Sequence, residues 1–275
     1  GLTRAMNEET QMVASAITEL TASASTVAEH AKQTADSVVE AEEQGQTANI
    51  LTGEASKTIN LLENQIENAG VVAVLVVDEV EAAVPLARAL LDGGITAMEL
   101  TLRTPAAMQA LQAVRKEVPE MLAGIGTILT PEQVTEVKDA GAAFGVAPGF
   151  NPRVVKAAQQ AQLQFAPGIA TPSELEGAIE LGCNNVKFFP AEGQGGLPFL
   201  KSILAPYKHL GVRAIPLGGL NLDNFGTYLA DDNVLAIGGT WIAPRALIQA
   251  RDWEAISANA VEARKRIDEI RKEIL

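Results

Sequence analysis

The sequence predicts a closed barrel of eight parallel β-strands and eight helices, the (β/α)8 fold, preceded by a long helix that forms a coiled coil. Two observations predict the barrel. Short apolar runs recur about every 20 to 28 residues after Gly70, and amphipathic stretches suited to helices separate them. A third observation, a heptad pattern in the first 70 residues, predicts the coiled coil.

The apolar runs are the expected strands. They lie at residues 71–77, 97–102, 122–128, 143–147, 164–167, 185–189, 213–217 and 234–238. Eight strands that alternate with helices in about 200 residues favour a closed barrel. An open doubly wound sheet is the main alternative, but no GxGxxG motif opens a helix to bind a nucleotide. We expect a helical coiled-coil extension at 1–69 and the barrel at 70–275.

The first 70 residues differ in composition from the rest. They contain no proline and no Phe, Trp or Tyr, and they carry eleven acidic but only three basic side chains. Small and hydrophobic residues recur in steps of four and three, as in a coiled-coil seam. The seam consists of Val13, Ile17, Leu20, Ala24, Val27, Ala31, Thr34, Val38, Ala41, Gly45, Ala48, Thr52, Ala55, Ile59, Leu62 and Ile66. A solvated amphipathic helix that needs a partner for stability is the simpler interpretation.

Charge and composition exclude several classes of protein. The net charge of −13 argues against nucleic acid and anionic membranes as partners. No apolar run approaches the length of a membrane helix, and no signal-peptide pattern opens the chain. Cys183 is the single cysteine, so a reducing cytoplasm is the expected location. With His30 and His209 far apart, no transition-metal site is expected. Because Gly1 stands where Met would, we expect a trimmed or replaced start.

Lys187 is the first candidate catalytic residue, because it interrupts an apolar strand in the segment NVKFFPAE. Alternation along a strand places Asn185, Lys187 and Phe189 on one face. If that face points inward, the amine lies inside the barrel, where desolvation favours the neutral, nucleophilic form of an amine. A lysine paired with a structural carboxylate is the alternative explanation.

The segment AMELTLRT supplies further charges. Glu99, Thr101 and Arg103 share one face of the expected strand 97–102. An inward carboxylate can transfer protons, and an arginine at a strand end can bind a substrate carboxylate through two parallel hydrogen bonds. An ion pair between Glu99 and Arg103 that merely fills the barrel is the alternative. Because charges on two strands point into one interior, we favour a functional site.

Two double glycines mark a candidate phosphate site. Gly218-Gly219 follows the seventh expected strand, and Gly238-Gly239-Thr240 follows the eighth. These two loops form the usual phosphate site of this fold, where bare backbone amides face the anion. Tight turns would explain each pair equally well. Thr127 ends the third expected strand and is either a ligand for a carboxylate or a plain strand terminus.

Eight segments, in order and at family spacing, closely resemble the bacterial 2-keto-3-deoxy-6-phosphogluconate aldolases. They are VVAVLVV, GGITAMELTLRT, GIGTILTPEQ, VAPGFNP, APGIATPSEL, VKFFPAE, PLGGLNLDN and AIGGTWIAP. The resemblance runs from about residue 70 to about residue 262. It implies cleavage of that sugar acid to pyruvate and glyceraldehyde 3-phosphate, and of 4-hydroxy-2-oxoglutarate to pyruvate and glyoxylate. It also implies a homotrimer that uses neither a metal nor another cofactor.

The resemblance gives each candidate residue a role. Lys187 would form an iminium with the ketone of the keto-acid substrate, and Glu99 would move protons while the C3–C4 bond breaks. The resemblance assigns the pyruvate carboxylate to Arg103 and Thr127, the pocket walls to Pro148 and Phe189, and the phosphate to Gly218, Gly219, Gly238 and Thr240.

One position departs from the family pattern. Leu217 precedes the first double glycine, where phosphogluconate enzymes of the family often carry threonine. Loss of that hydroxyl removes a possible hydrogen bond to the sugar chain. We therefore expect a relaxed stereochemical preference or a shift toward the shorter substrate. Thr240 stands where serine is common and keeps the hydroxyl.

Residues from about 6 to 66 resemble the descending cytoplasmic helix of methyl-accepting chemotaxis receptors. The hairpin tip that controls the receptor kinase and the returning helix are missing from this sequence, so receptor signalling is not expected. A receptor-like helix joined to an enzyme predicts an engineered fusion.

Two functions therefore stand beside each other. One is an active aldolase that carries a helical appendage. The other is a trimeric barrel used as a scaffold, with the helix driving larger assembly. Lys187, Glu99, Arg103 and Thr127 are all present, which favours an active enzyme. The small seam residues do not select an oligomer.

Overall fold

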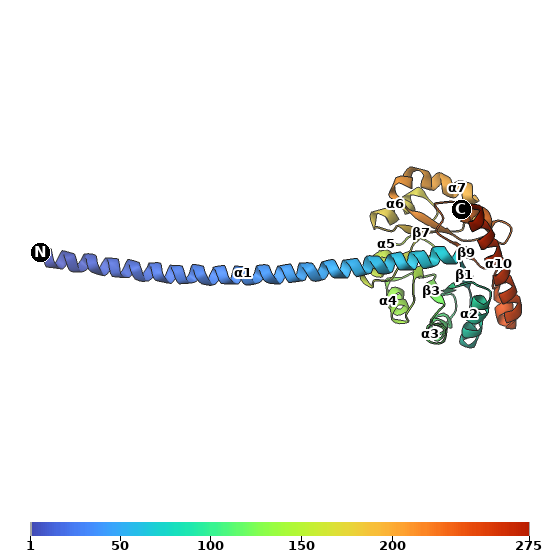
Figure 1. Cartoon of the computed structure of the whole chain (residues 1–275), viewed down its shortest axis with the longest axis horizontal. Coiled ribbons are helices and arrows are strands. Elements are labelled where there is room, and N and C mark those ends of the chain that lie inside the picture. The colour runs from blue at the N-terminus through green and yellow to red at the C-terminus, as the bar shows by residue number, and fades with distance from the viewer. Residues whose placement is uncertain (1, 275) are drawn as a thin grey trace. The chain divides into compact units, whose positions relative to one another are not determined.

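The computed structural model describes residues 2–274, apart from the side chains of residues 3–5, 42–43, 46–56, 58–59 and 274. The chain divides into two units, Gly1–Thr58 and Ile59–Leu275. Helix α1 (Leu2–Ala69) supplies the first unit, and its last turns belong to the second (Figure 1). The long N-terminal helix expected from the sequence is therefore present.

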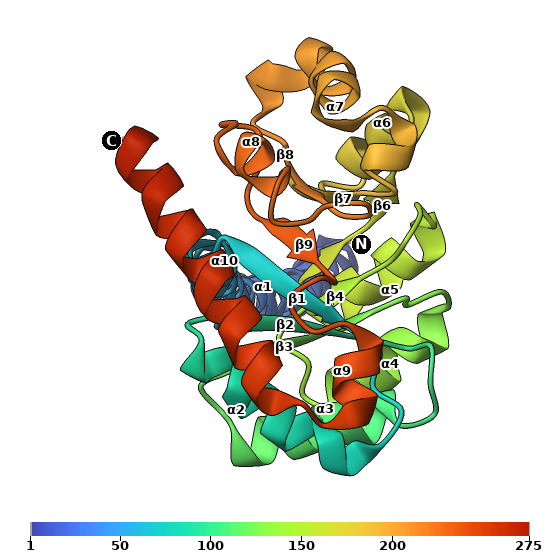
Figure 2. The same ribbon diagram turned by 90° about the vertical axis from the view of Figure 1, so that its right-hand side faces the viewer.

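The second unit alternates strands with helices (Figure 2). The strands are β1 (Val71–Leu75), β2 (Ala97–Thr101), β3 (Leu122–Gly126), β4 (Gly145–Val146), β5 (Phe165–Ala166), β6 (Gly168–Ile169), β7 (Asn185–Phe188), β8 (Arg213–Pro216) and β9 (Ile237–Gly239). The helices are α2 (Ala83–Asp92), α3 (Ala107–Glu117), α4 (Pro131–Asp139), α5 (Pro152–Gln160), α6 (Pro172–Glu180), α7 (Gly196–Leu204), α8 (Phe225–Leu229), α9 (Arg245–Ala250) and α10 (Trp253–Ile274). Short 3-10 helices are η1 (Val80–Ala82), η2 (Glu192–Gln194) and η3 (Ala205–Leu210).

Several helices begin at a signal that the sequence makes plain. Thr130 and Thr171 each cap the helix that follows, and Gln133 and Glu174 complete the two capping boxes. The proline after each threonine occupies the first turn, where a missing N–H costs nothing. Each cap fixes the residue at which the helix begins, and so fixes the length of the loop between that helix and the strand before it.

All strand pairs are parallel. They run in the order β5-β4-β3-β2-β1-β9 in one sheet and β6-β7-β8 in a second. Isolated parallel bridges join Leu217 to Gly238 and Ala214 to Val234, beside β8 and β9. Neighbours in the sheet therefore follow chain order, and Figure 2 shows helices around the strands. The α/β fold with a curled parallel sheet is confirmed.

The expected strand at 164–167 is interrupted. β5 ends at Ala166 and β6 begins at Gly168, because Pro167 has no N–H to offer to a ladder. β5 pairs with β4, whereas β6 pairs with β7, where Gly168 lies opposite Lys187. The strand expected at 164–167 is therefore present at Phe165–Ala166, and β6 is a further short strand after Pro167. The break separates the ladder that contains β2 from the ladder that contains β7.

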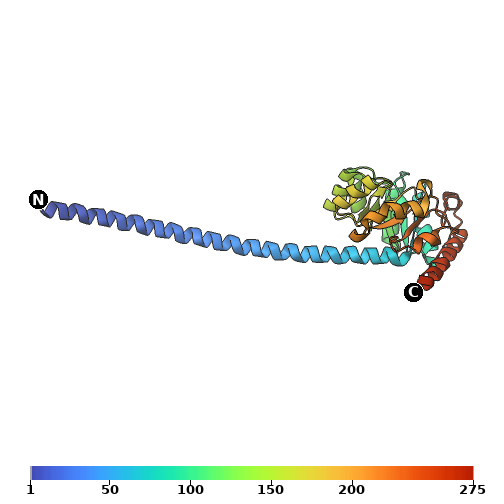
Figure 3. The same ribbon diagram turned by 90° about the horizontal axis from the view of Figure 1, so that it is seen from above.

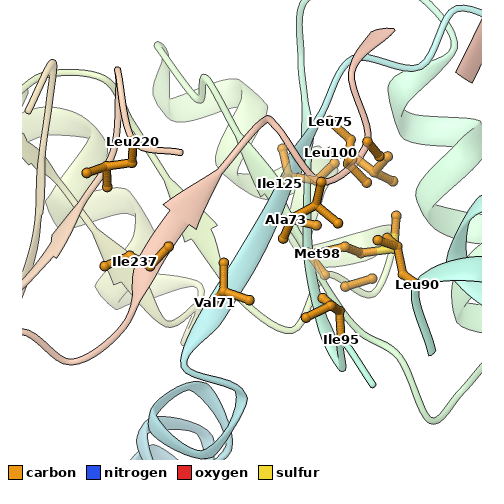
Figure 4. Packing of buried hydrophobic residues seen from close by; sticks show 14 of the residues in the cluster. Val71, Ala73, Leu75, Leu90, Ile95, Met98, Leu100, Ile125, Leu220 and Ile237 are labelled. Atoms are coloured by element: carbon orange, nitrogen blue, oxygen red, sulfur yellow. The ribbon is translucent and has the colours of Figure 1, made fainter. Parts of the chain in front are cut away.

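Two hydrophobic clusters fill the second unit, one on each face of the strands. The first lies between the strands and the helices, and Figure 4 shows Leu90 and Ile95 beside Met98 and Leu100 of β2. The second uses the opposite strand faces, the side that also carries Glu99. Its buried members are Ile66, Ala69, Val72, Ala97, Phe144, Val146, Ala166, Leu235 and Ala236. Ile66 and Ala69 come from α1, so the end of this helix is part of the core of the second unit.

Three arginines hold the last turns of α1 in the second unit. Arg264 and Arg271 of α10 donate to the terminal carbonyls of α1, at Glu67, Asn68 and Ala69. Figure 3 shows the C-terminal helix beside the end of α1. Cations are favourable there, because the last carbonyls of a helix lack partners and carry the negative end of its dipole. Arg213 of β8 adds an ion pair at 2.9 Å to Glu67. Residues 62–69 thus contact the rest of the second unit through both apolar and charged groups.

The seam of α1 has two different environments. Val13, Ile17, Leu20, Val27 and Val38 are between 51% and 69% exposed, whereas Leu62 and Ile66 pack into the second cluster. The seam residues Ala48, Thr52, Ala55 and Ile59 have side chains outside the described residues. Among the described residues, no helix is long and apolar enough to cross a membrane.

Candidate active site

Lys187 lies in the middle of β7 and is buried, with 6% of its surface exposed. Its Nζ atom is 3.1 Å from Oε1 and 3.3 Å from Oε2 of Glu99. The same atom lies 5.8 Å from the centre of the Phe189 ring, over its face. Asn185, on the same face of β7, donates at 2.5 Å to Glu63 of α1. The strand therefore directs one polar face away from the apolar layer beneath the helices, as alternation predicts.

Glu99 enters the same interior from β2 and is 4% exposed. Its carboxylate occupies the space above Gly126 of β3, where any Cβ would collide with Oε1. Thr101, on the same strand face, donates to the carbonyl of Leu75 at 3.0 Å. The structure thus brings the two charges together as an ion pair that is almost fully desolvated. Such a pair is stable only when each partner compensates the other, and it places an amine beside a proton acceptor.

Arg103 does not pair with Glu99. It lies two residues beyond the end of β2, its side chain is exposed, and it forms no ion pair with any described residue. The alternative in which Glu99 and Arg103 fill the barrel as an ion pair is therefore not what the structure contains. The guanidinium is available at the strand-end side of the sheet, where an anion can reach it.

Thr127 follows Gly126 at the end of β3, next to the carboxylate of Glu99. Its φ is 63°, in the left-handed region that a β-branched residue seldom adopts. Such a conformation persists only when its surroundings enforce it, and it is common at functional sites. Thr127 is partly buried and follows Gly126, the residue against which the Glu99 carboxylate lies.

Pro148 and Phe189 approach this region from two other strand ends. Pro148 follows β4, and its carbonyl group packs so closely against Gly168 of β6 that a Cβ at Gly168 would collide with it. Phe189 follows β7, and its ring lies 3.2 Å from the place of a Cβ on Gly218. Phe189 therefore contacts both the lysine and the first double glycine.

The two double glycines lie side by side. Gly218 and Gly219 adopt φ values of 103° and 82°, which glycine alone adopts readily. Their amide groups donate to no other described residue, and successive free amides in such a turn form an anion-binding concavity. Leu217 bridges to Gly238, and its side chain fills the space where a Cβ of Gly238 would stand.

The second double glycine differs from the expectation. Gly238 and Gly239 belong to β9, opposite Val72 and Ala73 of β1, so they do not form a loop after the strand. The prediction that the strand would end at residue 238 was wrong, because these glycines continue the ladder of β1. Thr240, the next residue, is exposed and stands at the strand end.

Sequence reasoning missed residues that support these groups. Gly126 gives Glu99 its room, and the GIGT segment gave no sign of that function. Asn224 donates to the carbonyl of Gly219 at 3.1 Å, and Tyr228 donates to Glu192 next to the same loop. Away from the site, burial raises the pKa of the Cys183 thiol to about 11, which makes this cysteine inert.

The fold and the buried lysine–carboxylate pair define a class of enzyme. Parallel α/β barrels carry their sites at the strand ends, and a desolvated lysine beside a proton acceptor suits chemistry on a ketone through a Schiff base. The class is that of the class I aldolases, lyases that cleave carbon–carbon bonds.

Comparison with known proteins gives the family. Residues 62–259 match the family model described as KDPG and KHG aldolase. The KHG/KDPG aldolase of Escherichia coli (strain K12) is 43% identical over 201 residues, which cover 73% of this chain and 93% of that protein. The chain belongs to the KDPG and KHG aldolase family.

Solved structures agree with this assignment. KDPG aldolase from Legionella pneumophila, captured with pyruvate as a covalent carbinolamine intermediate, is 40% identical with a TM-score of 0.68, over 70% of this chain and 93% of that one. A cube-shaped, porous protein cage designed by fusing symmetric oligomeric domains is 25% identical with a TM-score of 0.68, over 74% of each chain. The first similarity concerns an enzyme, and the second concerns a designed assembly.

Proposed function

We propose that the chain cleaves 2-keto-3-deoxy-6-phosphogluconate to pyruvate and glyceraldehyde 3-phosphate, and 4-hydroxy-2-oxoglutarate to pyruvate and glyoxylate. The observation that carries the proposal is the contact of 3.1 Å between the buried Lys187 Nζ and the Glu99 carboxylate. This contact places a nucleophile and a proton acceptor in a dry interior, where a ketone and a hydroxyl group two carbons away can be bound together.

The reaction uses the pair in sequence. The Lys187 amine attacks the C2 ketone, and with uptake of one proton, which the final hydrolysis gives back, water leaves to form an iminium cation. Glu99 takes the proton of the C4 hydroxyl, the C3–C4 bond breaks, and its electron pair neutralises the iminium as an enamine. The aldehyde departs. Glu99 then returns its proton to C3, and water releases pyruvate and regenerates the amine.

The remaining candidates bind the ends of the substrate. The exposed guanidinium of Arg103 and the hydroxyl of Thr127 suit the pyruvate carboxylate. Pro148 and Phe189 suit the walls of the pocket, because Phe189 lies under the Lys187 amine and Pro148 packs against Gly168, the residue opposite Lys187 in the sheet. The phosphate suits Gly218, Gly219, Gly238 and Thr240, of which Gly218 and Gly219 have free amides among the described residues.

Chemical trapping tests the proposal. The full chain is incubated with pyruvate, reduced with borohydride, and examined by intact mass and peptide mapping. We expect one pyruvyl adduct on Lys187, absent from Lys187→Ala and retained in Lys201→Ala, which removes an exposed lysine that pairs with Asp231. A folded protein without the adduct on Lys187 contradicts the proposal.

Assembly is the second candidate function, supported by the exposed seam of α1. Side chains of Val13, Ile17 and Leu20 that are 54% to 69% exposed are unusual on a monomeric surface unless they bind a partner. We propose a homotrimeric, closed barrel that carries the helix of residues 2–58 as an appendage for larger assembly, without receptor signalling. The bridges beside β8 and β9 support closure.

The mass of the particle tests the appendage. Light scattering compares the full chain with the fragment 59–275 and with a variant in which Ile17 and Leu20 are replaced by Asp. We expect a larger particle for the full chain and a trimer for the other two. A trimer in all three cases contradicts assembly through the helix. The engineered origin of the fusion and a cytoplasmic location stay predictions.

A further inference from the structure

Tyr228 and Glu192 form a partly buried hydrogen bond beside the first double glycine. Tyr228 lies on α8 and is 2% exposed, and its hydroxyl donates to Oε1 of Glu192 at the start of η2. Glu192 lies five residues beyond Lys187 in the chain, in the turn that leaves β7. The contact therefore joins the lysine-bearing strand to the helix that follows β8.

The turn at residues 191–192 is hydrogen-bonded to the backbone of the first double glycine. The Ala191 amide donates to the Leu217 carbonyl at 2.8 Å, and the Glu192 amide donates to the Gly218 carbonyl at 3.0 Å. The side chain of Glu192 lies directly below Gly219, where a Cβ would be 2.6 Å from the Cβ of Glu192. Movement of Glu192 would therefore move the double glycine.

Helix α8 holds the same loop from its other end. Asn224, the residue before α8, donates through Nδ2 to the Gly219 carbonyl at 3.1 Å. With this contact, three successive carbonyls, from Leu217 to Gly219, accept hydrogen bonds from η2 and α8. The amides of Gly218 and Gly219 have no such partner among the described residues. The hydrogen bonds to the carbonyls therefore fix the orientation of these peptide groups, and the amides stay free for a ligand.

We propose that the Tyr228–Glu192 hydrogen bond is a positioning contact that holds the Gly218 and Gly219 amides in the conformation that binds a phosphate group. Neither side chain touches the substrate. The inference rests on the proposed phosphate-bearing substrate, and it adds two residues that set the affinity for that end of the molecule.

Burial and charge agree with this role. Burial raises the pKa of the Tyr228 hydroxyl, and its hydrogen bond to Glu192 raises it further, so the group stays a donor throughout the neutral range. Glu192 itself is exposed and carries a negative charge close to an anion site. Since a carboxylate there repels phosphate, its presence is explained by the hydrogen bond and not by direct binding.

The experiment separates phosphate binding from chemistry. The full chain and Tyr228→Phe are compared on 2-keto-3-deoxy-6-phosphogluconate and on 4-hydroxy-2-oxoglutarate, which lacks the phosphate. We expect the KM for the phosphorylated substrate to rise about fivefold, the loss expected of one hydrogen bond, with kcat changed less than about twofold. Kinetics on the shorter substrate stay unchanged. The dissociation constant for inorganic phosphate, measured by 31P line broadening, rises by the same factor.

Matched variants exclude a general structural effect. Tyr207→Phe removes a second tyrosine–glutamate hydrogen bond, to Glu176 at 2.7 Å, away from the double glycine, and leaves all constants unchanged. Glu192→Gln keeps an acceptor for the tyrosine and retains phosphate binding, or strengthens it because the charge is gone. Glu192→Ala removes the same charge but also the acceptor, so it binds phosphate more weakly than Glu192→Gln.

Each contrary outcome has a definite meaning. Equal effects of Tyr228→Phe on both substrates would show a general structural role and overturn the positioning role. A wild-type chain that binds no phosphate would overturn it as well. Loss of the pyruvate adduct on wild-type Lys187, by contrast, would overturn the proposed aldolase function and is detected without any phosphate.

Discussion

At the scale of single residues, the site depends on space as much as on charge. Lys187 and Glu99 compensate each other in an interior where either alone would be costly. Their contact of 3.1 Å exists only because Gly126 leaves room for the carboxylate. The absence of a side chain at position 126 is therefore as much part of the site as the two charges.

Gly126→Ala should inactivate the enzyme while leaving it folded. The new methyl group would displace the Glu99 carboxylate, and misplacement of a reacting group by about 1 Å costs on the order of 100-fold in rate. We expect kcat to fall by about that factor, with the pyruvate adduct on Lys187 still formed. Gly149→Ala is the control for an added methyl group, since a Cβ there meets nothing within 4 Å and Gly149 is not among the glycines with positive φ. Unchanged kcat in Gly126→Ala would refute the packing argument.

Leu217→Thr should change the preference between substrates. The side chain of Leu217 lies beside Gly218 and against Gly238, where a hydroxyl can reach the sugar chain. One hydrogen bond contributes about 1 kcal/mol, or about fivefold. We expect kcat/KM for the phosphorylated substrate to rise by that factor relative to 4-hydroxy-2-oxoglutarate. Leu217→Val has the shape of threonine without the hydroxyl, so an equal gain in that variant would assign the effect to volume.

At the scale of helices and strands, the sequence predicted the strands well because apolar runs reflect burial. It also predicted the lysine, since a charge in such a run is conspicuous. It missed the break at Pro167, although a proline has no N–H to give to a strand. It also extended the seam of α1 to Ile66, because the sequence pattern of a heptad is the same whether the helix packs on a sheet or on another helix. Gly126 and Tyr228 were missed because their roles appear only when distant strands meet.

The end of α1 should be indispensable to the barrel. Ile66 is 6% exposed within the second unit, whereas Ile17, at an equivalent heptad position, is 58% exposed. Ile66→Ala should lower the free energy of unfolding of the barrel by about 2–5 kcal/mol, and Ile17→Ala should leave it unchanged. The fragment 59–275 should unfold at the temperature of the full chain, but 70–275 should not. Urea and thermal unfolding, followed by circular dichroism, measure both effects.

The acid tolerance of one ion pair is a second test at this scale. Asp78 accepts hydrogen bonds from Arg245 and Gln249, and these lower its pKa from 3.8 to about 2. Because the pKa falls on folding, the pair stabilises the protein above pH 3.8 and loses its effect as the pH falls through about 2. Carboxyl-carbon NMR should give a midpoint near 2 in the native chain and a higher one in Arg245→Ala. Equal midpoints would contradict the assignment.

At the scale of the whole molecule, charge and apolar surface oppose each other in the N-terminal helix. The first 70 residues carry eleven acidic and three basic side chains, so copies of the helix repel one another. The exposed seam residues favour association. The balance between the two should therefore depend on ionic strength, which screens the repulsion but leaves the burial of apolar side chains intact.

Salt should consequently enlarge the particle. We expect sedimentation to show more of the larger assembly at 0.5 M than at 0.02 M sodium chloride, with a Debye length that falls from about 20 Å to about 4 Å. Fragment 59–275 should show no such dependence. Dissociation of the full-length particle by salt would mean that ion pairs, and not the seam, hold it together.

The break at Pro167 has a mechanical consequence. Glu99 belongs to the ladder that ends at β5, and Lys187 belongs to the ladder that begins at β6. The proton acceptor and the nucleophile therefore lie in different β-ladders. The Lys187 amide donates to the Pro167 carbonyl at 2.8 Å, so the two ladders are joined at the residue that interrupts the strand. The backbone of Lys187 is therefore held at the junction of the two ladders, and a shift at Pro167 would change the distance between the lysine amine and the Glu99 carboxylate.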